Sequence, residues 1–538
     1  MYVQPQLNNR KVIQPRGKVL GGSSAINFMM LTYPSRGSID SWAALGNDGW
    51  DYDSLKPYFR KTATVHAPPQ CAKNVVGRIY NDDESITAEE GPIHISWSEG
   101  YGMTNAAWME AFSNLGLSAE SDIRVSDAIG AFQQPATIDP KTRTRSYAAT
   151  AHYGPDTAAR PNLVVLTGTY VKKIIFDTTN GTPIVSGVLA LTKDGLEETF
   201  YAGEVILAAG ALMSPQILEL SGIGSRKLLE SLDIRLVVDN PAVGENLQDH
   251  PMACQSFEVN DGVPSSDVLR DPEILKALVG QYQATAEGPM GQSNLSVANA
   301  PLSDQTGVLS VEAKKAFFAA HEQHMTTPDV DVLRALVESP NEPTIEYILF
   351  PGQSNTVLAE PTSMADYMDS SKTENYLGVL TLLHHPFSRG SVHITSPDVT
   401  VLPSWDPKLS DNPLDLEVTA RHVLFVERLI STEPLSSLFK KGGARIPDIV
   451  VGDDLEKAKE VVRQSQVTDF HPAGSCAMLP REKGGVVDTR LRVYGVKGLR
   501  IVDASIFPLE PVGHLQSVVY AVAEKAAQII KDDHGAKA

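Results

Sequence analysis

Residues 204–224, EVILAAGALMSPQILELSGIG, contain the pattern that decides the fold. The segment begins with an apolar run over 204–211, typical of a strand that is buried on both faces of a parallel sheet. Ser214 and Pro215 then supply an N-cap and a first-turn proline for a short helix, which the glycines at the end of the segment would terminate. A strand, a glycine turn and a helix are the arrangement in which α/β folds hold ligands at strand ends. The segment therefore predicts an α/β domain.

Flanking segments extend this domain in both directions. Upstream, the β-branched runs predict strands at 163–166, 170–176 and 185–191, with Asn180-Gly181 as a hairpin turn. Far downstream, residues 499–503 predict another strand, and residues 516–530 predict a helix with its apolar residues on one face. We therefore expect the C-terminus to complete the domain that the upstream strands begin.

Residues 251–465 have a different texture, with longer polar connections between the predicted elements. The patterns predict a helix at 312–321 and strands at 344–350, 377–383 and 390–394. Alternating strands of this kind favour an antiparallel sheet. The sequence thus predicts a second, α+β domain inserted into the first.

Composition excludes several classes of function. The 538 residues include 46 Lys and Arg against 65 Asp and Glu, and the net charge of −19 repels nucleic acids and anionic lipid heads. The longest apolar run, 205–213, is far shorter than the roughly 20 residues that cross a bilayer. The first twelve residues lack the apolar block of a secretory signal. Three dispersed cysteines give neither a disulfide framework nor a Cys-based metal site, and we predict no metal.

Three blocks carry the most specific patterns in the chain. Residues 16–27 are RGKVLGGSSAIN, residues 210–224 are followed by VGENLQDH at 243–250, and residues 471–478 are HPAGSCAM. In this order, and over nearly the whole chain, they resemble the signatures of the glucose-methanol-choline (GMC) oxidoreductases, a family of flavoenzymes. The resemblance implies an α/β, Rossmann-like FAD-binding domain interleaved with an α+β substrate domain.

The same resemblance implies the chemistry. Such a chain would oxidise a small-molecule alcohol by hydride transfer to flavin N5. His471 matches the catalytic histidine of the family, and His514 matches a second position that is His or Asn. Removal of a hydride requires loss of the hydroxyl proton, and a histidine with a pKa near 6.5 is suited to accept it near neutral pH.

Further matches imply the cofactor contacts. Ser23 and Asn27 match positions that touch the flavin, and Val171 matches one that meets the adenine. The amino-terminal amides of the helix that begins near Gln516 would stabilise a negatively charged flavin. The remaining matches are Asp503 and Ala504, near the ribityl and phosphate groups, and Leu515, Gln516 and Ser517 at that helix start. An aspartate that only caps the next turn is the alternative interpretation of Asp503. Residue 21 is Gly where some members carry a histidine linked to the flavin, so we expect non-covalent FAD.

One departure from the family pattern affects the cofactor site. Members carry a Gly-x-Gly-x-x-Gly turn and a ribose-binding acid before the block at 16–27, and the printed sequence has no such turn. We therefore expect the first βαβ unit to be missing, so that the chain expressed as written is poorly soluble or free of flavin. The expected boundaries are 1–90, 156–250 and 466–538 for the three parts of the FAD domain, 91–155 for a substrate or lid segment, and 251–465 for the substrate domain.

Three functions from different classes follow. The first is an FAD-dependent alcohol oxidase or dehydrogenase, with dioxygen or another molecule as the electron acceptor. The second is a non-redox cyclase or dehydratase that uses the same histidines, as in the fungal versicolorin B synthase. The third is an inactive remnant that binds no FAD. Flavin absorbance separates the first from the third, and product formation without consumption of an acceptor identifies the second.

Overall fold

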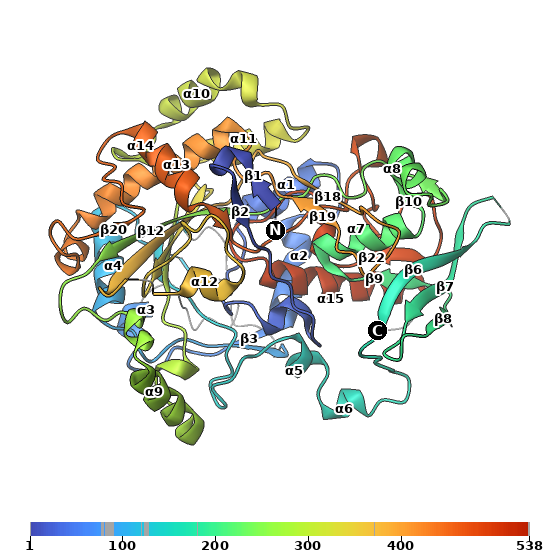
Figure 1. Ribbon diagram of the computed structural model, residues 1–538, viewed down its shortest axis with the longest axis horizontal. Helices are drawn as coiled ribbons and strands as arrows, with labels where there is room; N and C mark the ends of the chain where they lie inside the picture. The colour runs from blue at the N-terminus through green and yellow to red at the C-terminus, as the bar shows by residue number, and fades with distance from the viewer. Residues whose placement is uncertain are drawn as a thin grey trace.

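The computed structural model describes residues 2–76, 80, 91–119, 121–122, 129–179, 181–370 and 372–535. Figure 1 shows a large sheet in the left half of the molecule and a three-stranded meander at the right edge. The long helix α15 (Gln516–Asp533) lies between them. This arrangement confirms the predicted α/β domain interleaved with an α+β domain.

The large sheet is antiparallel throughout. In spatial order its strands are β20 (Arg445–Ile446), β12 (Pro251–Glu258), β17 (Tyr376–Leu383), β16 (Ile345–Phe350), β13 (Ser296–Ala300) and β5 (Gly130–Gln133), and β21 (Val467–Thr468) also pairs with β12. Two of these strands, β5 and β21, come from outside residues 251–465. The sheet therefore joins three separate stretches of the chain.

Helices cover one face of this sheet. The helices that contact its strands are α4 (Met103–Asn114), α13 (Pro413–Ile430) and α14 (Leu455–Ser465), while α10 (Val311–Ala320) packs against α11 (Val330–Glu338). Helix α13 contacts β17, and α14 contacts both α13 and β12. The odd-numbered residues of β16 point into this layer, where Tyr347 packs between Phe112 of α4 and Phe425 of α13. The even-numbered residues of β16 therefore point to the other face, since side chains alternate along a strand.

The other half of the fold holds a short parallel pair of strands and an antiparallel meander. The parallel pair is β9 (Val205–Leu207) with β22 (Leu499–Ile501), and the meander is β6 (Tyr170–Asp177), β7 (Ile184–Leu191) and β8 (Glu197–Tyr201). Its helices are α1 (Arg36–Ala44), α2 (Tyr52–Thr62), α7 (Gly210–Leu220), α8 (Arg226–Ser231) and α15. The partner strand of β9 comes from near the C-terminus, so the C-terminal segment completes this half.

The remaining strands and α-helices lie outside the large sheet, the parallel pair and the meander. They are β1 (Tyr2–Gln4), β2 (Arg10–Val12), β3 (Ala63–Val65), α3 (Lys73–Val76), β4 (Ile93–Ile95), α5 (Ala148–His152), α6 (Pro155–Ala158), β10 (Ile223–Gly224), β11 (Val238–Asp239), α9 (Pro272–Thr285), β14 (Ser303–Asp304), β15 (Gly307–Val308), α12 (Met364–Met368), β18 (Ser391–His393) and β19 (Ser404–Asp406). The strand predicted at 390–394 is β18, which pairs with β19 outside the large sheet.

The predicted start of helix α7 is wrong. The helix begins at Gly210, so Ser214 and Pro215 lie inside it and do not form its N-terminus. The carboxylate of Asp503 accepts hydrogen bonds from the Gly210 N–H and from the Ser214 hydroxyl. An acid at the amino end of a helix is favourable. Asp503, a residue from the far end of the chain, therefore caps the helix one turn earlier than the local pattern predicts.

The strand predicted at 163–166 is also wrong. These residues form an irregular segment in which Val164 is 77% exposed. The run at 204–211 gives only the three-residue strand β9, and its central Ile206 is 46% exposed, so it is not buried on both faces. A β-rich pattern becomes a strand only where a neighbouring strand satisfies its backbone groups. Within the described residues, β22 is the one strand that pairs with β9.

No helix in the described ranges has the length and hydropathy that a membrane crossing requires.

The four consecutive exposed apolar side chains at 163–166 predict how the 538-residue chain behaves when it is expressed by itself. Exposed apolar surface promotes association and binds the dye ANS. We expect strong ANS fluorescence and aggregation, both reduced in the double variant Val164→Lys with Leu166→Lys. Val450→Lys, at an exposed position elsewhere, is the matched control and should change neither. A monodisperse printed chain without ANS fluorescence would contradict this expectation.

Candidate active site

Strand β16 delivers a buried carboxylate to the face of the sheet opposite the helices. Glu346 follows the alternation that sends Tyr347 into the helical layer. Its side chain is fully buried, and its Oε1 lies 3.4 Å from Nε2 of His514. The apolar sheet positions this acid, which no sequence pattern had identified.

His514 is held by the loop that leads into helix α15. Its backbone N–H donates to the hydroxyl of Thr32 at 2.8 Å, and the N–H of Gly513 lies 3.3 Å from Nδ1 of His384. Gly513 has a φ of +79°, and a Cβ atom there would lie 2.3 Å from the Thr32 hydroxyl oxygen. Only glycine allows this approach. The loop thus fixes His514 at the start of the helix.

His471 is held by the segment that follows β21. Its N–H donates to Oδ1 of Asp249 at 3.0 Å, and the guanidinium of Arg16 donates to the carbonyl of Phe470 at 3.1 Å. Phe470 has a φ of +64°, a left-handed conformation that is strained for a bulky residue. Strain of this kind is concentrated at functional sites.

The structure brings the two predicted histidines into contact. Nε2 of His471 lies 3.4 Å from Nδ1 of His514, and the ring planes cross at 78°. Oδ2 of Asp469 lies 3.3 Å from Nδ1 of His471 and 3.5 Å from Nδ1 of His514. The side chains of the two histidines are 14% and 9% exposed, so the pair is accessible from one side and otherwise enclosed.

The surroundings shift the pKa values of the two imidazoles in opposite directions. Burial lowers the pKa of His471 well below its usual value, and the neighbouring His514 and His250 lower it further. Burial also opposes protonation of His514, but the carboxylates of Glu346 and Asp469 outweigh it and raise the pKa of His514. Burial raises the pKa of Asp469 to about 7. The site therefore favours a neutral His471, able to accept a proton, beside a His514 that donates hydrogen bonds.

A second group of predicted residues meets at the amino end of α15. Nδ2 of Asn27 donates to Oε1 of Gln516 at 3.1 Å, although the two residues are 489 positions apart. No side chain caps this helix, and among the described residues Nε2 of Gln516 and the hydroxyl of Tyr520 are buried without a hydrogen-bond partner. The structure thus presents unpaired donors where the sequence predicts cofactor contacts.

The other predicted cofactor residues have contacts within the protein. Ser23 accepts a hydrogen bond from the N–H of Gly17, and the hydroxyl of Ser517 donates to the carbonyl of Thr32. Asp503 also accepts from the N–H of Ser505, so its two oxygens cap both α7 and the turn at 504–506. Val171 pairs with Ala190 in the meander, Leu515 is buried, and Ala504 is half-buried.

Sequence reasoning missed four ionisable residues at the histidine pair: Glu346, Asp469, His250 and Glu510. His250 ends the block at 243–250, and Asp469 precedes His471 by two residues, so position near a motif was an available signal for both. Glu510 lies in the tail at 484–530, which resembles the C-terminal block of the family, and precedes His514 by four residues, whereas Glu346 lies in no such block. Only the packing of the chain identifies Glu346.

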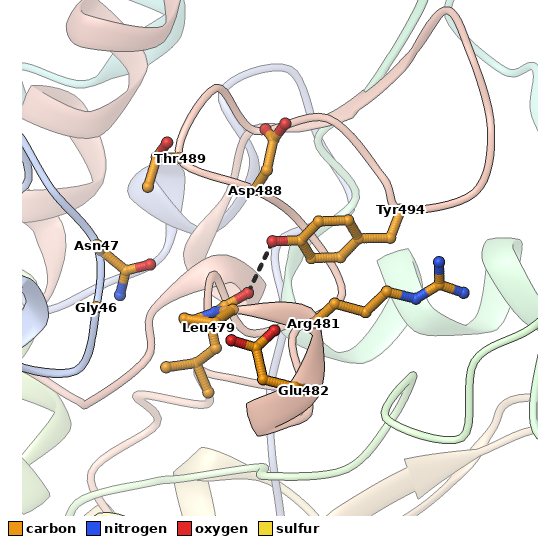
Figure 2. A pocket seen from close by; sticks show the side chains of 9 residues that line it. Gly46, Asn47, Leu479, Arg481, Glu482, Asp488, Thr489 and Tyr494 are labelled. Carbon is orange, nitrogen blue, oxygen red and sulfur yellow. Dashed lines mark hydrogen bonds between the residues drawn. The ribbon is translucent and has the colours of Figure 1, made fainter.

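A separate surface pocket has a volume of about 320 Å³ and is shown in Figure 2. It lies between the loop at 46–47 and the segment 479–494, where the hydroxyl of Tyr494 donates to the carbonyl of Leu479 at 3.1 Å. It contains none of the predicted site residues, so its position gives no reason to place the chemistry there.

Comparison with known proteins is consistent with this geometry. Residues 3–252 and 386–523 match the N-terminal and C-terminal parts of the GMC oxidoreductase family. A dehydrogenase of Armillaria gallica is 34% identical over 98% of this chain and 82% of its own length. An FAD-dependent oxidoreductase from Chaetomium thermophilum superimposes with a TM-score of 0.84 at 28% identity, over 99% of this chain and 89% of the other. A fungal aryl-alcohol oxidase gives a TM-score of 0.79 at 28% identity, over 99% and 88%.

The family match and the similar proteins identify an oxidoreductase that acts on the CH–OH group of alcohols with FAD. The chain belongs to the GMC oxidoreductase family.

The residues present fit the ring end of FAD. A flavin ring carries several hydrogen-bonding atoms, and the unpaired Gln516 amide, the Tyr520 hydroxyl and the uncapped start of α15 are groups that could bind them. Gly22 leaves open space where a Cβ would be, beside the exposed Ile26 and Phe28.

The carboxylates around His514 predict the effect of removing one of them. Because Glu346 raises the pKa of His514, we expect Glu346→Gln to lower that pKa, since an adjacent opposite charge is removed. The protonated form of His514 would then be lost at a lower pH than in the unaltered protein. NMR titration of the His514 ring protons measures this. Glu219→Gln removes a buried acid beside His393 and is the control. An unchanged His514 pKa in Glu346→Gln would refute the assignment.

Proposed function

We propose that His471 is the base that takes the hydroxyl proton of an alcohol, and that His514 binds the hydroxyl oxygen. The observation that carries this proposal is the pair of facing nitrogens, Nε2 of His471 and Nδ1 of His514, 3.4 Å apart. The lowered pKa of His471 and the raised pKa of His514 support these two roles. A base and a hydrogen-bond donor at this spacing can contact the same hydroxyl group.

FAD is held, in this proposal, by the groups that the family resemblance implies. Asn27 and Gln516, the start of α15 at Leu515 and Ser517, and the segment with Ser23 would bind the ring. Asp503, Ala504 and Val171 would lie along the rest of the cofactor. When bound, FAD supplies the acceptor for the hydride that leaves the alcohol carbon. The protein's own part is to orient the alcohol and to take its proton.

The substrate in this proposal is an alcohol with an apolar, aromatic body. Ile348 lies two residues from Glu346 on the same face of β16, in a cluster with Trp97 and Phe132. Phe470, directly before the proposed base, packs against this cluster. The aryl-alcohol oxidase among the similar structures supports the same class. An apolar face beside the histidines favours an apolar substrate over a polyhydroxylated one.

Stopped-flow reduction of bound flavin tests these roles, with 4-methoxybenzyl alcohol and D-glucose as probes. In flavin-loaded protein, His471→Ala should slow the bleaching of flavin by roughly 10²-fold or more, the scale of general-base loss. His514→Asn should have a smaller effect, because Asn still donates a hydrogen bond. His534→Asn, at an exposed histidine, is the control.

Two results would contradict the proposal. Unaltered speed in His471→Ala would exclude that residue as the base. Faster reduction by glucose than by the aromatic alcohol would exclude the apolar substrate class.

The geometry at residue 21 predicts that the flavin is not covalently linked there. Gly21 has a φ of +92°, and a Cβ atom would lie 2.8 Å from the ring of Tyr147, so the position accommodates no linking side chain. We expect acid denaturation of the flavin-loaded protein to release all flavin into the supernatant. Flavin fluorescence that stays with the precipitated polypeptide would show a covalent bond. The released flavin also identifies the cofactor by mass.

A further inference from the structure

The histidine pair belongs to a longer line of buried ionisable groups. Nδ1 of His471 lies 3.0 Å from Nδ1 of His250, and Nε2 of His250 lies 3.6 Å from Oε2 of Glu510. The side chains of His250 and Glu510 are fully buried. His471 also contacts His514, as described above. Each of the three imidazoles, His514, His471 and His250, therefore uses one ring nitrogen for the neighbour on one side and the other nitrogen for the neighbour on the other side. The line runs from Glu346 through the three histidines to Glu510.

The far end of this line has no other use in the structure. Among the described residues, Nε2 of His250 and both carboxylate oxygens of Glu510 make no close hydrogen bond, and Nε2 of His250 lies 3.6 Å from Oε2 of Glu510. Buried polar atoms without a partner destabilise a fold and are rarely kept without a role. The proposed reaction at His471 and His514 leaves this end of the line unexplained.

The surroundings of Glu510 and His250 suit proton storage. Burial and the nearby acids Asp249 and Asp469 raise the pKa of Glu510 well above its usual value, although Arg389 opposes them. Burial, followed by the neighbouring His384, His385 and His514, lowers the pKa of His250 well below its usual value. Both shifts favour a proton on Glu510 and disfavour a second proton on His250. A neutral imidazole between an acid and a base can pass a proton through its two nitrogens.

We propose that His250 and Glu510 form a proton relay that takes the substrate proton from His471 and stores it inside the protein. This inference rests on the proposed function of His471.

The transfer starts with Glu510 ionised, at a pH above its raised pKa, and is then balanced in atoms and charge. The hydroxyl O–H bond breaks, and its proton bonds to Nε2 of His471. His471 then gives the proton on its Nδ1 to Nδ1 of His250, and His250 gives the proton on its Nε2 to the carboxylate of Glu510. The electron pair of the O–H bond stays on the alcohol oxygen, and no group is oxidised or reduced in these proton transfers. Both imidazoles end neutral with the proton on the other nitrogen, and Glu510 ends as a neutral acid.

The relay makes His250 and Glu510 positioning residues, and its first test needs no substrate. When Glu510 is ionised, the proton of neutral His250 is on Nε2, which faces the carboxylate. Nδ1 of His250 then has no proton and can accept one from His471, so the proton of neutral His471 is on its Nδ1. We therefore expect His471 to change tautomer as the pH rises. ¹⁵N NMR of histidine-labelled, flavin-loaded protein detects this change, with His471→Asn to assign the signals.

The variants separate a relay from a structural role. Glu510→Gln keeps the shape but cannot release a proton, so it should abolish the tautomer change of His471, while Glu510→Asp should restore it. His250→Asn should abolish it as well. Glu219→Gln, at a buried acid that contacts His393, should leave it intact. A tautomer change that persists in Glu510→Gln, or one absent from the unaltered protein, would overturn the proposal.

A second measurement follows the proton during reaction. In anaerobic reduction by 4-methoxybenzyl alcohol, the unaltered protein should release little proton to a pH-indicator dye, whereas Glu510→Gln should release about one proton per flavin. Equal release in both would overturn the relay. If no alcohol reduces the flavin but the tautomer change follows Glu510 as expected, the proposed function fails while the coupling of Glu510 to His471 stands.

Discussion

The constraint on which this structure depends is the enclosure of ionisable side chains that have little contact with water. Glu346, His514, His471, His250 and Glu510 are largely or wholly buried, and each is close to the next in line. A buried charge without a partner strongly destabilises the folded state. Each of these groups therefore needs a neighbouring group that the fold holds within reach of it. The sheet, the entry to α15 and the segment after β21 are positioned with the accuracy that this requires.

This constraint gives a physical reason for the interleaved fold. Glu346 comes from the centre of the large sheet, His514 from the start of α15, and His471 from the segment that follows the edge strand β21. The packing of Tyr347 against Phe425 fixes strand β16 relative to helix α13. The close approach of Gly513 to Thr32 fixes the start of helix α15. A site built in this way needs both halves of the molecule to be folded, because neither half holds a complete set of groups.

Where local patterns misled, a distant residue or the lack of a neighbour was the cause. Ser214 and Pro215 have the composition of a helix start, yet the carboxylate of Asp503 begins α7 at Gly210. Residues 163–166 have the composition of a strand but remain irregular. Helix caps and strands both depend on partners that satisfy backbone groups, and a local pattern does not show whether such a partner is present.

By itself, the sequence determined the family and the fold class, and it predicted the two histidines of the proposed site, because short contiguous blocks carry these signals. It also placed Asn27 and Gln516 in one cofactor site, and the structure brings them into contact. Only the tertiary structure decided which acids face the histidines and that His250 joins them, since His250 and His471 are 221 positions apart. Which groups meet, and therefore which imidazole favours its neutral form, depends on burial and on charges from distant segments.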